Sequence, residues 1–179
     1  LDGEDTASHS TYRPVAVYAS DVNGDGITEL PRAVLMAGYK DTSSSDAVYM
    51  LDWYAYGIGK VPTKVATTYQ NISDAWSLLI DQKWHDRITA IKVSDGGLSY
   101  VEFFEYRKNK MSIPLFNIYC ATGSNREYYA ERTDLIQLGQ TTQAIYFAKL
   151  TNEGEQSELA LTGDEIKARF SLVNQAWNN

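Results

Sequence analysis

The chain has 179 residues, of which 44% are hydrophobic and 22% are charged, and these proportions are typical of a folded globular protein and not of a disordered or collagen-like one. Its 16 Lys and Arg against 23 Asp and Glu give a formal net charge of −7, which disfavours binding to nucleic acids and anionic membrane surfaces, because both need a basic face. Since no apolar stretch approaches the roughly 20 residues of a transmembrane helix, no membrane span is predicted.

β-Strands dominate the elements that the sequence predicts. After a polar N-terminal segment over residues 1–13, short runs rich in β-branched and aromatic residues alternate with turns rich in Gly, Asp, Ser and Asn. The Asp-Gly-Gly run within residues 94–97 is typical of a β-hairpin. The predicted strands cover residues 14–19, 32–37, 47–56, 61–69, 88–93, 98–107, 112–121, 128–138 and 144–150, and a further apolar run begins at 75–80 before the polar turn 81–86.

The C-terminal part of the chain follows a different period. Apolar residues recur every three or four positions from Ile166 to Trp177, which predicts an amphipathic helix over residues 163–177. Thr162 or Asp164 would cap the N-terminus of this helix, because a side-chain oxygen there can accept a free backbone N–H.

One loop carries the pattern of a metal site. Residues 21–29 read DVNGDGITE and lie between two predicted strands. Calcium takes six to eight oxygen ligands at about 2.3–2.6 Å, so it needs carboxylates and carbonyls crowded on a short, curved backbone. The loop therefore predicts a calcium site that staples a turn between two strands. Its expected ligands are the side chains of Asp21, Asn23 and Asp25, the backbone carbonyl of Ile27, and Glu29 directly or through water.

The loop is not expected to be an EF-hand. An EF-hand has a bidentate Glu at its twelfth position and continues into a helix, whereas Arg32 occupies that position here and Pro31 precedes a β-prone run. Without a bidentate closing residue, we expect weak binding in the roughly 0.1–1 mM range of extracellular calcium modules. The alternative is a simple hairpin turn, since Asn-Gly and Asp-Gly favour turns, but turn chemistry does not require Glu29.

The sequence DVNGDGITELP between two strands resembles the calcium loops of FG-GAP and VCBS-type repeats of extracellular proteins, in which an acidic residue at the ninth position completes the site. The resemblance covers about residues 14–37 and implies a calcium cofactor. Such loops come in several copies within a β-propeller, whereas this pattern occurs once in the chain. The block over residues 76–150 is similar, in the order of its elements, to C-terminal regions of uncharacterised surface lipoproteins of Gram-positive bacteria, which carry a calcium-type loop upstream.

We therefore expect an α+β fold that is predominantly antiparallel β-sheet with a C-terminal amphipathic helix. A domain boundary is predicted near Ile72, because the strands around the loop precede it and a second block rich in hairpins follows. Residues 1–71 would form a β-hairpin region with the calcium loop, at the end of a larger repeat or propeller-like domain if one precedes it. Residues 72–179 would form an α+β domain that ends in the helix.

Few residues offer catalytic chemistry. The two histidines are His9 in the N-terminal segment and His85 in a polar turn, and a hydrolase triad would have to rest on His85 without a Gly-x-Ser-x-Gly elbow. The single cysteine, Cys120, is expected to be a small buried residue on a strand. A glycosidase needs two facing carboxylates, which the spacing of the candidates does not identify. Those candidates are Glu102, Glu105, Glu127 and Glu131.

These features predict an exported, non-enzymatic bacterial protein that binds or scaffolds at the cell surface and carries one structural calcium. Its expected partner is an unidentified protein or glycan at that surface. Because the chain begins without Met, it is expected to be a mature fragment whose removed N-terminus could have carried a lipid anchor. The alternative is a carbohydrate-binding module of a larger extracellular enzyme. Its sugar platform would be a row of exposed rings drawn from Trp53, Tyr54, Tyr56, Tyr128 and Tyr129.

Overall fold

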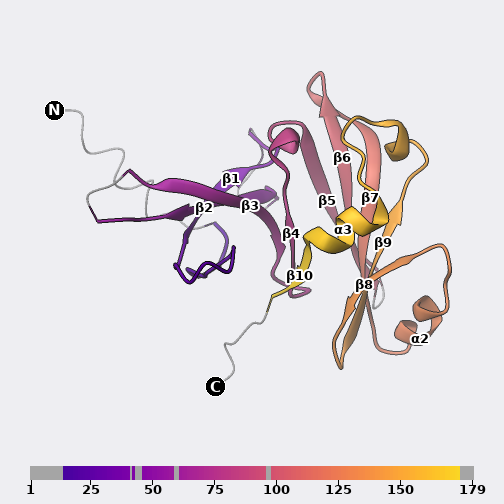
Figure 1. The fold of residues 1–179 in the computed structure, drawn as a ribbon. Coiled ribbons are helices and arrows are strands. Elements are labelled where there is room, and N and C mark those ends of the chain that lie inside the picture. Colours follow the sequence, from indigo (N-terminus) through magenta and orange to yellow (C-terminus); the bar gives the residue numbers. More distant parts are fainter. Residues whose placement is uncertain (1–13, 41, 43–45, 59–60, 96–97, 174–179) are drawn as a thin grey trace.

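A computed structural model describes residues 14–40, 42, 46–58, 61–95 and 98–173. Within these residues the chain is mostly antiparallel β-sheet, arranged as two five-stranded sheets with short helices beside them (Figure 1). The prediction of a fold dominated by antiparallel sheet is therefore confirmed. None of the helices in the described part of the chain has both the length and the apolar character needed to cross a bilayer.

The first sheet combines the N-terminal strands with a strand near the C-terminus. Its strands, in spatial order, are β1 (Leu30–Leu35), β2 (Tyr49–Ala55), β3 (Thr63–Asn71), β4 (Trp76–Leu79) and β10 (Phe170–Leu172). The second sheet contains, in spatial order, β5 (Ile88–Asp95), β6 (Leu98–Arg107), β7 (Lys110–Thr122), β9 (Ala144–Leu150) and β8 (Ile136–Gln140). The remaining elements are α2 (Asn125–Ala130), α3 (Gly163–Arg169) and two 3-10 turns, Gln82–Trp84 and Gly154–Gln156.

One hydrophobic core joins the two sheets. The ring of Tyr69 on β3 meets the ring of Phe103 on β6 edge to face at 5.4 Å, and Phe103 stacks on Phe116 of β7 at 4.8 Å. Such aromatic pairs add about 0.5–1.5 kcal/mol each beyond the area that they bury. The predicted boundary near Ile72 falls between β3 and β4, which pair with each other, and core residues lie on both sides of it. The division into 1–71 and 72–179 stays a prediction.

The C-terminal helix is present but shorter than the predicted 163–177. Thr162 caps α3 through a capping box, in which its Oγ1 accepts the N–H of Glu165 and the Glu165 carboxylate accepts the N–H of Thr162. The helix ends before Phe170, which begins β10, pairs with β4 and buries its ring in the core. Burial of this ring overrides the helical period, and residues 174–177 lie outside the described residues.

Two predicted strands are corrected by the structure. Residues 14–19 form no strand, because the backbone that precedes the loop pairs with the chain after it only through a bridge from Ser20 to Glu29. Residues 128–138 begin inside helix α2, and strand β8 starts only at Ile136. Tyr129 of α2 packs with a small cluster around Phe147, on the outer face of the second sheet.

Candidate metal site

The loop over residues 21–29 curls around the carboxylate of Asp21. Oδ1 of Asp21 accepts the backbone N–H groups of Gly24 at 2.8 Å and Asp25 at 3.1 Å, and Oδ2 accepts that of Gly26 at 2.8 Å. The glycines permit this curl because their φ angles of 77° and 83° lie in the left-handed region. Donation from the N–H of Gly26 is the largest influence on the pKa of Asp21 and lowers it, and desolvation, the next largest, opposes it. Donation from Gly24 and Asp25 adds to the lowering, so the pKa of Asp21 lies below its usual value. Asp21 is therefore ionised at neutral pH.

Asn23 and Asp25 tighten the same curl. Oδ1 of Asn23 accepts the N–H of Asp25 at 3.1 Å, and its Nδ2 donates to Oδ2 of Asp25 at 2.9 Å. Oδ1 of Asp25 accepts the N–H of Ile27 at 2.8 Å. These bonds of side chains to nearby backbone are the turns that Asn and Asp favour, and they hold the side chains of Asn23 and Asp25 against the loop.

Glu29 is the last residue of the loop, and its buried side chain bonds back to the start of the loop. Its side chain is 0% exposed, and its Oε2 accepts the N–H of Val22 at 2.9 Å. Its other oxygen, Oε1, is also buried but accepts no hydrogen bond from the described residues. The backbone of Glu29 exchanges two hydrogen bonds with Ser20, at 3.0 and 3.1 Å, which fix the position of the side chain. Glu29 thus places a buried carboxylate oxygen without a donor at the base of the loop.

One oxygen from each of Asp21, Asp25 and Glu29 lies within 4.8 Å of the other two. Oxygens bound to one calcium ion at about 2.4 Å lie no more than about 4.8 Å apart, so this spacing suits a single ion. The structure thus gathers three of the five predicted ligands. Asn23 and Ile27 lie in the same loop, and the role of all five residues as ligands stays a prediction.

Glu105 on β6 is a second buried carboxylate, and its partners differ from those of Glu29. Its side chain is 0% exposed, like that of Glu29, but Ser157 donates to it at 2.7 Å, and Arg107 and Arg87 both form ion pairs with it. Burial alone would raise the pKa of Glu105, yet these hydrogen bonds and positive charges outweigh it and leave the pKa below its usual value. Glu29 has one neutral N–H where Glu105 has a hydroxyl and two guanidinium groups.

The other residues considered for catalysis do not converge with the loop. His85 pairs with the neighbouring Asp86 at 3.1 Å in its turn. Glu102 accepts a long hydrogen bond from Asn117 at 3.4 Å, and Glu127 belongs to α2. Cys120 is buried on β7, as the sequence predicts.

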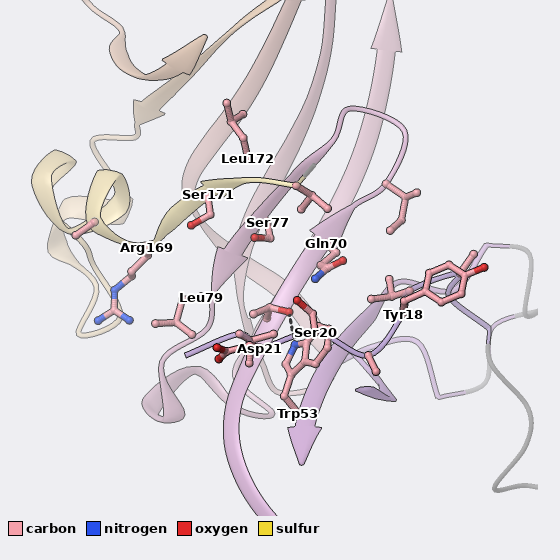
Figure 2. Close-up of a pocket in the computed structure, with 18 residues that line it drawn as sticks. Tyr18, Ser20, Asp21, Trp53, Gln70, Ser77, Leu79, Arg169, Ser171 and Leu172 are labelled. Atoms are coloured by element: carbon pink, nitrogen blue, oxygen red, sulfur yellow. Dashed lines mark hydrogen bonds between the residues drawn. The ribbon is translucent and has the colours of Figure 1, made fainter. Parts of the chain in front are cut away.

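A groove of about 970 Å³ adjoins the loop on the outer face of the first sheet, and sequence reasoning did not find it (Figure 2). Segment 16–22, which leads into the loop, forms one side of the groove. The strand register sets Gln70 of β3 opposite Ser77 of β4, and Ser77 opposite Ser171 of β10, so these three polar residues form a row across the floor. No single sequence pattern could reveal this row, because its members come from three distant segments.

The aromatic residues considered for a sugar platform do not share one surface. Trp53 is 1% exposed and donates from Nε1 to the hydroxyl of Thr68 at 2.9 Å. Tyr56 follows β2 of the first sheet, whereas Tyr128 lies on α2, which packs against the second sheet. These two rings are exposed, but they lie on different parts of the fold.

Comparisons with protein-family models, with curated proteins and with solved structures gave no match for this chain. What the loop and the groove can bind is therefore inferred from their own geometry.

Proposed function

We propose that this chain is an exported, non-enzymatic bacterial domain that binds or scaffolds at the cell surface and holds one structural calcium in the loop 21–29. The main support for the calcium site is that Oε1 of Glu29 is buried and accepts no hydrogen bond from the described residues. An ionised carboxylate that is fully buried with a single neutral N–H is unfavourable unless a cation or a proton compensates it. One oxygen each from Asp21 and Asp25 lies within 4.8 Å of an oxygen of Glu29, and these would supply further ligands for a calcium ion.

The ion would be structural because its ligands hold together a loop that has little regular structure. Three carboxylates within one curl repel one another, and a dication removes that repulsion. A strand-flanked loop of this kind is expected to bind calcium in the roughly 0.1–1 mM range of extracellular modules. Such an affinity would suit constant occupancy outside a cell, where the domain is proposed to act.

Thermal unfolding in calcium and in chelator tests the site. At a free calcium concentration about ten times Kd, binding to the native state contributes about 1.4 kcal/mol, which corresponds to a rise in Tm of roughly 3–6 °C for a protein of this size. Asp25→Ala should abolish this rise. Glu131→Ala is the matched control, because it removes the same charge from an exposed position at the end of α2 and should keep the rise.

Magnesium separates a calcium site from general screening of negative charge. Magnesium demands near-octahedral geometry at about 2.0–2.1 Å and gives up its water reluctantly, so it should stabilise the protein much less than calcium at equal concentration. An equal rise in Tm with both ions, or no rise in millimolar calcium, would contradict the proposed site.

A further inference from the structure

The floor of the groove beside the loop offers hydrogen bonds of both kinds. Gln70, Ser77 and Ser171 form a cross-strand row there, and each hydroxyl can donate and accept. Oε1 of Gln70 is shielded and accepts no hydrogen bond from the described residues. The terminal amide of Gln70 carries both an acceptor and a donor, and a half-turn of the amide exchanges their positions.

The charged groups that line the groove are already engaged. Arg169 donates to the carboxylate of Asp81 at 2.9 Å. The carboxylate of Asp21 accepts the three backbone N–H groups of the loop. With a net charge of −7 on the chain, this surface favours a neutral ligand over an anionic one.

Apolar surface borders the polar row. Leu79 is 42% exposed, Leu172 is 38% exposed and the ring of Tyr18 is 57% exposed, and all three line the groove. Sugar rings carry hydroxyls at their edges and C–H groups on their faces, which matches a polar row with apolar borders. A volume of about 970 Å³ lies at the upper end of the roughly 300–1,000 Å³ of small-molecule pockets, so the groove has room for several sugar units.

From this chemistry we infer that the groove binds a neutral oligosaccharide and that calcium in the neighbouring loop strengthens the binding. The second half of this inference rests on the proposed calcium site, and the first half does not. The inference names the class of ligand for the proposed cell-surface function and places its binding site on the first sheet.

The wall of the groove connects the two sites. Segment 16–22 lines the groove, and its last residues belong to the loop (Figure 2). Hydrogen bonds join Ser20 and Val22 of this segment to the backbone and side chain of Glu29. An ion that holds Glu29 would therefore also restrain segment 16–22. Its removal would leave only these hydrogen bonds to hold the segment, which raises the cost of ordering it around a ligand.

Isothermal titration of the whole chain in calcium tests the groove, with hexasaccharides of glucose, mannose and N-acetylglucosamine as probes. At least one hexasaccharide should bind, and Gln70→Ala should weaken that binding about tenfold, as expected for the loss of a well-placed hydrogen bond. Gln137→Ala is the matched control, because Gln137 is an exposed glutamine on β8 of the other sheet. It should bind the sugar as the unaltered chain does.

The outcomes separate the groove from the calcium site. Failure of all three hexasaccharides to bind at millimolar concentration would overturn the inference, as would binding that Gln70→Ala leaves unchanged. Binding of a neutral Ser- and Thr-rich peptide in place of every sugar would overturn it in favour of a peptide site. Gln70→Ala should keep the calcium-induced rise in Tm. Sugar binding that is unaffected by chelator would reject the coupling alone, and sugar binding without any calcium-induced rise would reject the calcium site alone.

Discussion

The backbone N–H of Val22 donates a 2.9 Å hydrogen bond to Oε2 of Glu29. Because Val22 directly follows Asp21, this bond connects the two ends of the acidic loop. This bond fixes one oxygen of the carboxylate and leaves Oε1 as the oxygen available to a cation. A single side chain thus closes the loop and places a buried carboxylate in it. These two tasks can be separated by substitution.

Glu29→Gln separates them because Gln keeps an oxygen for the N–H of Val22 and removes the charge. Without calcium, the variant should be at least as stable as the unaltered chain, since it no longer buries an ionised carboxylate with one neutral partner. With calcium, it should lose most of the rise in Tm. Thermal unfolding of both proteins in calcium and in chelator measures this crossover.

Glu127→Gln provides the control for that experiment, because Glu127 is an exposed acid on α2. It should change stability by no more than about 0.5 kcal/mol in either buffer, as surface substitutions generally do. A Glu29→Gln protein that is clearly less stable than the unaltered chain in chelator would show that the carboxylate contributes stability without a metal.

Acid should remove the stabilisation by calcium. Donation from the N–H of Gly26 holds the pKa of Asp21 below its usual value, so the stability that this carboxylate contributes is present above the unfolded pKa of about 3.9. That stability is lost as the pH falls through the lower pKa of the folded state. Protons also compete with calcium for all three carboxylates. The difference in Tm between calcium and calcium-free buffers should therefore be constant near neutral pH and shrink as the pH falls below about 3.9.

Chelators bind calcium poorly in acid, so the comparison requires buffers made without calcium. A difference in Tm that does not decrease at any pH below about 3.9 would argue against carboxylate ligands.

The acidic loop could be predicted from the sequence because its Asp, Asn and Glu residues lie within nine consecutive positions and its turns depend on local chemistry. The long strands could also be predicted, since runs such as those of β6 and β9 are rich in aromatic and β-branched residues. The chain around residue 128 shows the limit of such propensity. Tyr128 and Tyr129 favour strands, but Arg126, Glu127 and Ala130 favour helices, and they form α2.

The groove and the end of α3 depend on contacts between distant parts of the chain. Helix α3 ends before Phe170 because the backbone of Phe170 pairs with β4 and its ring packs in the core. The spacing of apolar residues in the local sequence predicts neither contact. The row of Gln70, Ser77 and Ser171 likewise exists only once β10 has paired beside β4. Side-chain period alone assigns each of these residues to one face of a strand and says nothing of its neighbours.

Cys120 should resist thiol reagents in the folded protein. Its side chain is 4% exposed, and burial, with a smaller contribution from the charge of Asp74, raises its pKa to about 11. The reactive thiolate is therefore scarce at neutral pH, and reagents have little access to it. A chromogenic disulfide should label the chain fully in denaturant and very slowly in native buffer. Rapid labelling in native buffer would contradict the packing of β7 against the core.

Within the ion-pair network of Glu105, Glu158, Arg87 and Arg107, Glu105 should account for most of the contribution to the free energy of unfolding. Glu105→Gln leaves Arg87 and Arg107 without their buried partner, and we expect a loss of about 2–3 kcal/mol. Glu158→Gln is a matched control, because Glu158 pairs with the same two arginines but its side chain is 67% exposed. Exposed ion pairs contribute at most about 1 kcal/mol, so this variant should lose much less. Urea unfolding of the three proteins measures both values.

The pH dependence of these variants gives a second measure of the same network. Because the pKa of Glu105 is lowered in the folded state, its stabilisation is present above the unfolded pKa of about 4.3 and is lost as the pH falls through the folded value. The gap in unfolding free energy between the unaltered chain and Glu105→Gln should therefore be constant near neutral pH and narrow in acid. A gap that is unchanged in acid, or an equal loss in Glu158→Gln, would show that packing and not the buried charge carries the effect.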